Sequence, residues 1–434
     1  MSKQFSNHYQ NEWHPNIWPP FTQIKKNKPQ IEVTHGKDAL IYTKNPVQEL
    51  IDGISSWWVT LHGHSNEYIA HSIAEQAQKL EQIIFADFLH PQAKELSERI
   101  TRITKLDRVF FSDNGSTAIE VALKIAYQWW QNQGEERYQI IAFDGAYHGD
   151  TFGAMALGER NIFNANFERL MFPVKRAQWP STWINDDKVE NKEEMAIDSL
   201  IELLKKPTAA VILEPIIQGA GGMNMVRPEF VKKVAEVVKQ NNSLLIADEV
   251  LTGFGRTGSL FAFQKADIKP DIIALSKGLT GGFLPMGLTV SKEKIFQSFI
   301  SDAPEKTFWH GHSFTANPLG CAAANASLDL LEKEPSKFLD FEKRHLSLLS
   351  ILNNLPNTKK FRICGTICAF ELEAGGGAGY MNNIGKEVKA NAIEEGLFIR
   401  PLGNVIYLMP PLCITDNQLL RSYNVIEKVL NKYI

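Results

Sequence analysis

The stretch LIADEVLTGFGRTG, residues 245–258, raises the question from which the fold and the site follow. With Leu244 in front of it, the first part reads LLIAD, an apolar run that is typical of a buried β-strand. The run leads directly into two adjacent acids, Asp248 and Glu249, and only then into glycines. A buried carboxylate needs a positive partner, because an unpaired buried charge is costly. The sequence therefore predicts a cation next to Asp248.

Similar apolar runs alternate with helical patterns from about residue 70 to residue 330. Runs that are apolar at every position indicate strands covered on both faces, as in a mainly parallel sheet flanked by helices. We therefore predict the α/β fold class, with strands at RVFFS (108–112), QIIAFD (139–144), AAVILEP (209–215), SLLIAD (243–248) and DIIAL (271–275). Between them, STAIEVALKIAYQWW (116–130) predicts a helix with one apolar stripe, which begins with Thr117-x-x-Glu120 as a capping box.

Changes in composition divide the chain into three parts. Residues 1–69 begin with a segment rich in Trp and Pro, and we expect them to pack on the body of the protein and its active site. Residues 70–330 form the large domain. Residues 331–434 are expected to form a smaller α+β domain with a long helix, strands around FRICGTICAFELE, a glycine loop AGGGAG, a helix, short strands at FIRP and VIYLMPP, and a last helix from about Thr415.

Composition excludes several classes of function. A formal charge of -3 offers no basic field for nucleic acid. No stretch approaches the roughly 18 apolar residues of a membrane-spanning helix, and the first residues lack the apolar core of a signal peptide, so we expect a cytoplasmic protein. The four cysteines show no metal-ligand spacing and are expected to be buried free thiols.

Two short motifs have weak functional interpretations. GFGRTG (253–258) matches the dinucleotide fingerprint, but five residues, both acids among them, separate it from the apolar run, so we expect a surface turn. HGHS occurs at 62–65 and again at 310–313, which would suit a metal-dependent hydrolase that also uses the two acids. A motif this short also recurs by chance, and we predict no metal site.

Lys277 indicates which cation faces Asp248. It stands in SKGLTGG, just past the run DIIAL, while Asp248 ends a second strand and Glu214 a third. The carboxyl ends of parallel strands meet at one edge of a sheet, where ligands bind. A lysine and an aspartate there fit pyridoxal phosphate, because the amine forms a Schiff base and the carboxylate keeps the pyridine nitrogen protonated. The cation facing Asp248 is then a pyridinium.

The same cofactor needs a phosphate site and a ring partner. In SDNGSTAIE, Gly115 and Ser116 stand at a predicted helix start, where unpaired amides and the helix dipole attract a dianion. In FDGAYHGDT, Tyr147 and His148 follow another strand, and either can lie on the ring. Each motif alone is equally compatible with an ordinary turn or a packed loop.

Six ordered motifs resemble the class III pyridoxal-phosphate aminotransferases of fold type I. They are NGSTAIEVALK, YHGDTFGAMALG, ILEPIIQGAGGM, LIADEVLTGFGRTG, PDIIALSKGLTGG and GHSFTANPLGCAAA, and the resemblance covers nearly the whole chain. It implies a homodimer with active sites at the subunit boundary. It also implies that Lys277 is the Schiff-base lysine and Asp248 the pyridine partner, that Gly115 and Ser116 bind phosphate, that Tyr147 stacks, and that Ser313 reaches the phosphate in the neighbouring subunit.

Three further stretches, IWPPFTQ, DGISSWW and FIRPLGNVIYLMPP, are similar to one branch of the class that acts on a long-chain keto acid. The resemblance places Trp57, Tyr147 and Arg400 at the substrate, with Arg256 nearby. This agrees with the chemistry, because an aliphatic chain needs aromatic walls and a distal carboxylate needs a guanidinium. The walls are offered by Trp18, Phe21, Trp57 and Trp58, and the guanidinium by Arg400.

Two departures from the pattern of that branch leave the amino donor open. Phe21 stands where Tyr is common, and His312-Ser313 stands where Pro-Thr is frequent. The donor implied by the resemblance is S-adenosylmethionine, with lysine as the alternative. The rival functions are another class III aminotransferase for ω-amino acids, of the ornithine or 4-aminobutyrate type, the metal-dependent hydrolase, and a non-catalytic relative. The paired tryptophans of DGISSWW argue against the first of these.

Overall fold

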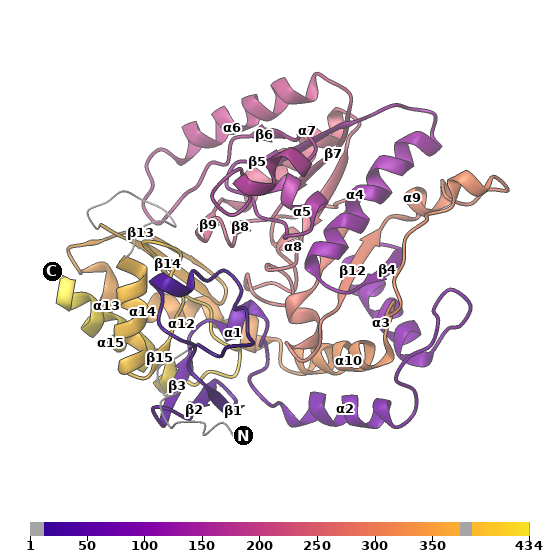
Figure 1. The fold of residues 1–434 in the computed structure, drawn as a ribbon. Coiled ribbons are helices and arrows are strands. Elements are labelled where there is room, and N and C mark those ends of the chain that lie inside the picture. The colour runs from indigo at the N-terminus through magenta and orange to yellow at the C-terminus, as the bar shows by residue number, and fades with distance from the viewer. Residues whose placement is uncertain (1–12, 374–383, 434) are drawn as a thin grey trace.

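A computed structural model describes residues 13–373 and 384–433 of the 434-residue chain (Figure 1). Its centre is a seven-stranded sheet in which only β12 runs antiparallel to its neighbours. In spatial order the strands are β4 (Arg108–Ser112), β12 (Gly287–Ser291), β11 (Ile272–Leu275), β10 (Leu244–Asp248), β7 (Thr208–Leu213), β5 (Gln139–Phe143) and β6 (Lys175–Ala177). The prediction of an α/β fold with a mainly parallel sheet is confirmed.

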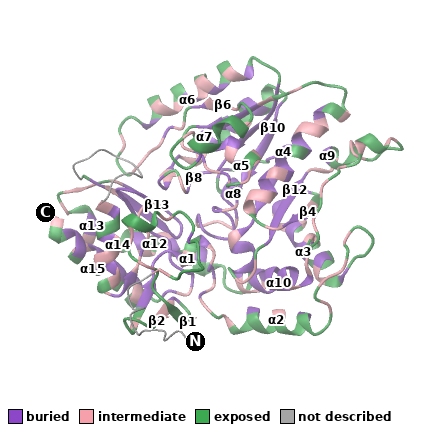
Figure 2. Ribbon diagram, in the orientation of Figure 1, coloured by how far each residue is buried: buried purple, intermediate pink, exposed green. Residues whose placement is uncertain are grey.

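Apolar side chains on both faces of these strands explain why helices cover the sheet on both sides. In β10, Leu245 and Ala247 belong to the core cluster that includes α7 (Pro228–Gln240), while Leu244 and Ile246 belong to the cluster that includes α4 (Gly115–Asn132). Burial follows the same division, with buried residues along the strands and exposed residues on outer helices such as α6 (Val189–Leu204) (Figure 2). The remaining helices around this body are α2 (Glu67–Ala77), α3 (Pro91–Thr104), α5 (Phe152–Leu157), α8 (Ala262–Lys265), α9 (Glu293–Gln297) and α10 (Pro318–Lys333).

Two smaller sheets lie outside the central one, and the first of them pairs the two ends of the chain. The first contains β1 (Val33–Lys37), β2 (Leu40–Thr43), β3 (Gln48–Asp52) and β15 (Leu397–Phe398), so that an early segment pairs with a late one. The second contains β13 (Thr358–Cys364), β14 (Ile367–Leu372) and β16 (Val405–Leu408). The helices of this region are α11 (Ser336–Leu339), α12 (Phe341–Leu348), α13 (Ser350–Asn353), α14 (Ile384–Glu394) and α15 (Asp416–Leu430). The glycine loop AGGGAG and residues 1–12 lie outside the described residues.

Several local predictions are wrong. The side chain that caps α4 belongs to Asn114, which forms a capping box with Thr117, so Thr117 and Glu120 do not form one. The expected long helix after residue 331 is three short helices. The turn GFGRTG is buried rather than on the surface, because the β13–β14 hairpin packs against it: a Cβ on Gly365 would lie 2.1 Å from the Gly258 nitrogen.

Candidate active site

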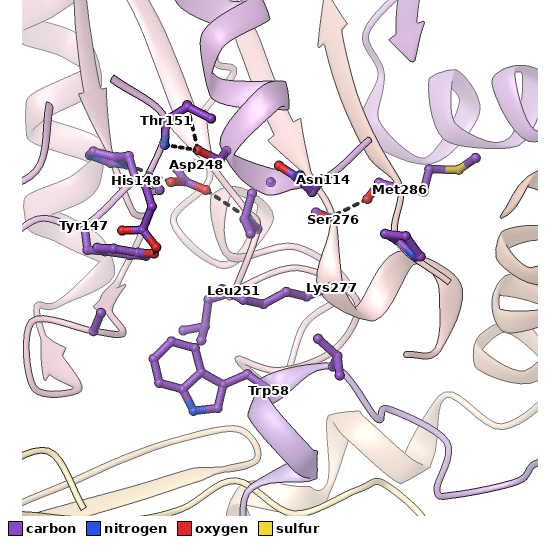
Figure 3. A pocket seen from close by; sticks show the side chains of 18 of the residues that line it. Trp58, Asn114, Tyr147, His148, Thr151, Asp248, Leu251, Ser276, Lys277 and Met286 are labelled. Atoms are coloured by element: carbon purple, nitrogen blue, oxygen red, sulfur yellow. Dashed lines mark hydrogen bonds and ion pairs between the residues drawn. The ribbon is translucent and has the colours of Figure 1, made fainter. Parts of the chain in front are cut away.

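Three ionisable residues follow neighbouring strands at one edge of the central sheet. Asp248 ends β10, Glu214 follows β7, and Lys277 follows β11 after one serine. The parallel register pairs Asp248 with Ala274 and Ala247 with Leu213, which brings these strand ends level with one another. All three side chains line one cavity of about 680 Å³ (Figure 3). The prediction that they converge agrees with this geometry.

Lys277 reaches into the cavity from the first residue of a short 3-10 helix, η4 (Lys277–Thr280). Its backbone φ of 40° lies in the left-handed region, which residues other than glycine rarely adopt. Its Nζ lies 5.0 Å from the centre of the Trp58 ring. Burial lowers the pKa of Lys277, and the charges of Asp248 and Glu214 partly oppose this shift. A lowered pKa increases the fraction of neutral amine, which is the nucleophilic form.

Asp248 is held in place by two hydrogen bonds. Its Oδ2 lies 2.7 Å from Nδ1 of His148, and its Oδ1 accepts a hydrogen bond of 3.0 Å from the amide of Val250. Both side chains are buried, and Nε2 of His148 has no hydrogen-bond partner among the described residues. His148 therefore orients the carboxylate. This role was not predicted from the sequence, although the position of His148 in the loop after β5 was a signal for a residue of this site.

The second acid of the opening stretch faces away from the cavity. Glu249 accepts hydrogen bonds from the Thr252 hydroxyl (2.6 Å) and from the amides of Ala262 (3.1 Å) and Phe263 (2.7 Å) at the start of α8. Burial raises the pKa of Glu249 to about 7. Glu249 is thus a structural helix cap, and only Asp248 serves the cavity.

Glu214 anchors the wall that carries Tyr147. Its carboxylate accepts hydrogen bonds from the amides of Tyr147 (3.1 Å) and Gly219 (2.9 Å). Burial raises the pKa of Glu214 to about 7, His148 counteracts this shift and Asp248 adds to it. The Tyr147 hydroxyl donates to Asp150 at 3.0 Å, and burial together with Asp150 holds the pKa of Tyr147 well above its ordinary value. Tyr147 therefore presents a neutral ring to the cavity.

The amino end of α4, a helix of 18 residues, forms another part of the cavity wall. Gly115 and Ser116 line the cavity at its first turn. A Cβ on Gly115 would lie 2.6 Å from Cγ1 of Val250, so only glycine lets the helix end approach this closely. The exposed amides and the dipole of such a helix end bind phosphate. A phosphate site, a neutral ring, a lysine amine and a fixed carboxylate in one cavity fit pyridoxal phosphate.

Three of the predicted substrate residues, Phe21, Trp57 and Arg400, form a second group that does not line the cavity. The Trp57 and Phe21 rings are in edge contact, with centroids 5.6 Å apart, and the Arg400 guanidinium carbon lies 4.8 Å from the centre of the Trp57 ring. Trp57 is 40 % exposed, whereas Trp58 is buried and donates a hydrogen bond to the Tyr407 hydroxyl at 2.9 Å. The backbone at Trp57 is kinked rather than extended, and the Trp57 ring is exposed whereas the Trp58 ring is buried.

Arg256 is almost fully buried in the turn that was expected on the surface. One guanidinium nitrogen, Nη1, donates to the carbonyl of Pro410 at 3.0 Å. Nε and Nη2 have no partner among the described residues. Burial lowers the pKa of Arg256 to about 10, and Asp52 opposes the shift. Two unused buried donors on one guanidinium are suited to an acidic ligand.

Ser313 and the two HGHS segments lie apart from the cavity lining. Ser313 is exposed, and its carbonyl accepts a hydrogen bond from Gln82 at 2.6 Å. His62 contacts Ser327 (2.9 Å), whereas His310 contacts Lys124 (3.0 Å). Burial lowers the pKa of His62 to about 3. Among residues 13–373 and 384–433, no group of His, Cys, Asp and Glu forms a metal site, and no helix combines the length and apolar character needed to cross a membrane.

Comparison with known proteins identifies the class. The family model "Aminotransferase class-III" matches residues 22–430, and the chain belongs to this family, whose enzymes use pyridoxal 5'-phosphate. An adenosylmethionine-8-amino-7-oxononanoate aminotransferase from Synechococcus elongatus is 52% identical over 422 residues, which are 96% of this chain and 99% of that protein. A Geobacter sulfurreducens protein of the same name is 36% identical over 96% of both chains.

Solved structures agree with the class. The crystal structure of adenosylmethionine-8-amino-7-oxononanoate aminotransferase from Methanocaldococcus jannaschii matches with a TM-score of 0.88 and 32% identity, over 96% of this chain and 97% of that one. A PLP-bound amine transaminase from an uncultivated Pseudomonas species matches with a TM-score of 0.90 and 27% identity, over 96% and 99%. The predictions of fold type I, of a transaminase and of its cofactor are confirmed.

Proposed function

We propose that this protein transfers an amino group to 8-amino-7-oxononanoate to form 7,8-diaminononanoate, a step of biotin biosynthesis, with S-adenosylmethionine as the donor. Full-length similarity to proteins of that name supports the substrate. The observation that carries the chemistry is that Lys277 and Asp248 line one cavity at the ends of adjacent parallel strands.

Each residue of the cavity has one task in this reaction. When bound, pyridoxal phosphate supplies a ring that accepts the electrons left as the α proton of the amino donor departs. Lys277 takes that proton at its Nζ and delivers a proton to C7 of the keto acid in the second half of the reaction. Asp248, oriented by His148, keeps the pyridine nitrogen protonated. Gly115 and Ser116 bind the phosphate, and Tyr147 covers the ring.

The aromatic and cationic group of Phe21, Trp57 and Arg400 selects the substrate. Phe21 and Trp57 pack on the aliphatic chain of the keto acid, and Arg400 binds its distal carboxylate. No anionic partner of Arg400 occurs among the described residues, which leaves its guanidinium available. Arg256, whose charge acts on the Lys277 amine, contributes its unused N–H groups to the binding of an acidic substrate.

A second copy of the chain completes the site. Trp309 is 75% exposed and Phe314 is 63% exposed, and they flank Ser313 on a loop that Gln82 holds. We assign this apolar surface to a homodimer in which Ser313 reaches the phosphate of the partner's cofactor. All four cysteines are free thiols, which favours the reducing cytoplasm as the location.

Product formation tests this function. The purified protein, loaded with pyridoxal phosphate, is incubated with 8-amino-7-oxononanoate and either S-adenosylmethionine or lysine, and diaminononanoate is measured by mass spectrometry. We expect product with S-adenosylmethionine. If product forms with lysine but not with S-adenosylmethionine, lysine is the donor. No product with either, but amino transfer from ornithine or 4-aminobutyrate, would replace the proposal with an ω-amino-acid aminotransferase.

A further inference from the structure

Three polar side chains from two helices form a hydrogen-bonded chain behind the phosphate end of the cavity. Ser116 and Glu120 stand four residues apart on α4 and therefore share one face of the helix. Thr151 faces them from the start of α5. Its Oγ1 lies 2.8 Å from Oγ of Ser116 and 2.5 Å from Oε1 of Glu120, and its amide donates to Oγ of Ser116 at 3.0 Å.

Glu120 performs the capping task that would ordinarily fall to Thr151. Thr151 occupies the N-cap position of α5, where a threonine oxygen usually accepts an amide of the first turn, yet its side chain makes no such bond. Instead, Oε1 of Glu120 accepts the amide of Ala154 at 3.0 Å. This exchange frees the Thr151 side chain to connect Glu120 with Ser116.

Two glycines make room for this arrangement. A Cβ on Gly153 would lie 2.2 Å from Oε2 of Glu120, and a Cβ on Gly149 would lie 2.3 Å from Oγ of Ser116. Gly149 also has a φ of +138°. The backbone around Thr151 is therefore shaped to the two side chains of α4.

The number of protons decides what each hydroxyl can do. A hydroxyl has one proton to donate, and an ionised carboxylate only accepts, so the Thr151 proton belongs to Glu120. The Thr151 oxygen can then only accept. The Ser116 oxygen accepts the Thr151 amide, and its own proton lies in the 2.8 Å contact with the Thr151 oxygen. A phosphate dianion in the cavity is a stronger acceptor than this neutral hydroxyl and takes that proton.

We propose that Glu120 and Thr151 are positioning residues for the Ser116 hydroxyl. Glu120 anchors Thr151, and the Thr151 amide holds the Ser116 oxygen at the place from which its hydroxyl donates to the phosphate of the cofactor. This inference rests on the proposed function, in which Gly115 and Ser116 bind that phosphate. Thr151 lines the cavity but donates to Glu120, so its contribution passes through Ser116.

Cofactor affinity with and without a phosphate group tests the proposal. The apoprotein is titrated with pyridoxal phosphate and with pyridoxal, which lacks the phosphate, and binding is followed by tryptophan fluorescence. Glu120→Ala and Thr151→Val should weaken the affinity for pyridoxal phosphate roughly tenfold, as expected when a hydrogen bond to a charged group is lost. Both variants should bind pyridoxal like the unmodified protein. Glu120→Gln and Thr151→Ser keep the acceptor and the hydroxyl, and should retain most of the affinity.

Gly153→Ala provides an independent variant, because its added methyl group displaces the Glu120 carboxylate, and it should reproduce the pattern of Glu120→Ala. Equal weakening for both ligands would mean a general structural role and would overturn the proposal. A loss in Thr151→Val without one in Glu120→Ala would mean that Thr151 binds the phosphate directly, which would also overturn it. If the unmodified protein binds pyridoxal phosphate and pyridoxal equally, Gly115 and Ser116 do not bind the phosphate. That result would contradict the proposed function itself, whatever the variants show.

Discussion

At the scale of the residue, two adjacent acids have opposite tasks because successive residues at the end of a strand face different sides. Asp248 meets His148 and the cavity, whereas Glu249 caps α8 inside the core. We therefore expect turnover to depend on Asp248, and Glu249 is its matched control.

Asp248→Asn should preserve the fold and slow the reaction. The amide cannot keep a pyridine nitrogen protonated, so proton transfer from the donor should fall about 100-fold or more, as when a strong electrostatic stabiliser is lost. Stopped-flow measurement with an excess of donor reports that step. Glu249→Gln should leave its rate within a few-fold of the original. Similar rates in both variants would remove Asp248 from the mechanism.

Arg400→Ala should separate the two substrates. The guanidinium stacks on Trp57 and has no ion-pair partner among the described residues, so its charge is free for the keto acid. Loss of hydrogen bonds to a carboxylate should raise the KM for 8-amino-7-oxononanoate by about 10- to 100-fold, with little change for the donor. Steady-state kinetics with each substrate varied in turn measures this. An equal increase for both would assign Arg400 to the donor as well.

At the scale of the element, the sequence was informative where a pattern is local. Apolar runs predicted β4, β5, β7, β10 and β11, and the strand-end rule predicted which residues would meet. β12 was not predicted, because GLTVS contains Gly287 and Thr289 and lacks a continuous apolar run. The burial of GFGRTG and the cap at Asn114 were also missed, since the first depends on a distant hairpin and the second on competition between neighbouring polar residues.

The cap of α8 should give stability a pH dependence. Because burial raises the pKa of Glu249 to about 7, the folded state binds its proton more tightly than the unfolded chain does. Its contribution to stability is therefore complete below the unfolded pKa and is lost as the pH rises through about 7. Urea unfolding of the apoprotein measures how far the free energy of unfolding falls between pH 5 and pH 8. This fall should be smaller in Glu249→Gln than in the original protein, by about 1 to 3 kcal/mol. An identical decrease in both proteins would contradict the assigned shift.

At the scale of the whole molecule, the site uses both ends of the chain. β3 pairs with β15, which brings Trp57 and Arg400 together although more than 300 residues separate them. A single-sequence pattern does not reveal such pairing, so the resemblance to a family was needed to connect these residues. The role proposed for Ser313 is the one that requires a second copy of the chain.

Mixed dimers test whether sites are shared. Lys277→Ala removes the amine, and Ser313→Asp places a negative charge where the partner's phosphate is expected, so each variant alone should be nearly inactive. If sites are shared, a mixed dimer contains one site with both original residues, and unfolding, mixing and refolding the two variants should restore activity toward half per mixed dimer. Light scattering verifies the dimer. No recovery in verified mixed dimers would show that Ser313 does not act across the interface.

The central claim is that Lys277 holds the cofactor in the cavity that Asp248 also lines. Reduction of the loaded protein with borohydride fixes the cofactor covalently to the amine that carries it, and peptide mass spectrometry then identifies that lysine. We expect the pyridoxyl group on Lys277. A pyridoxyl group on any other lysine, with Lys277 unmodified, would contradict it.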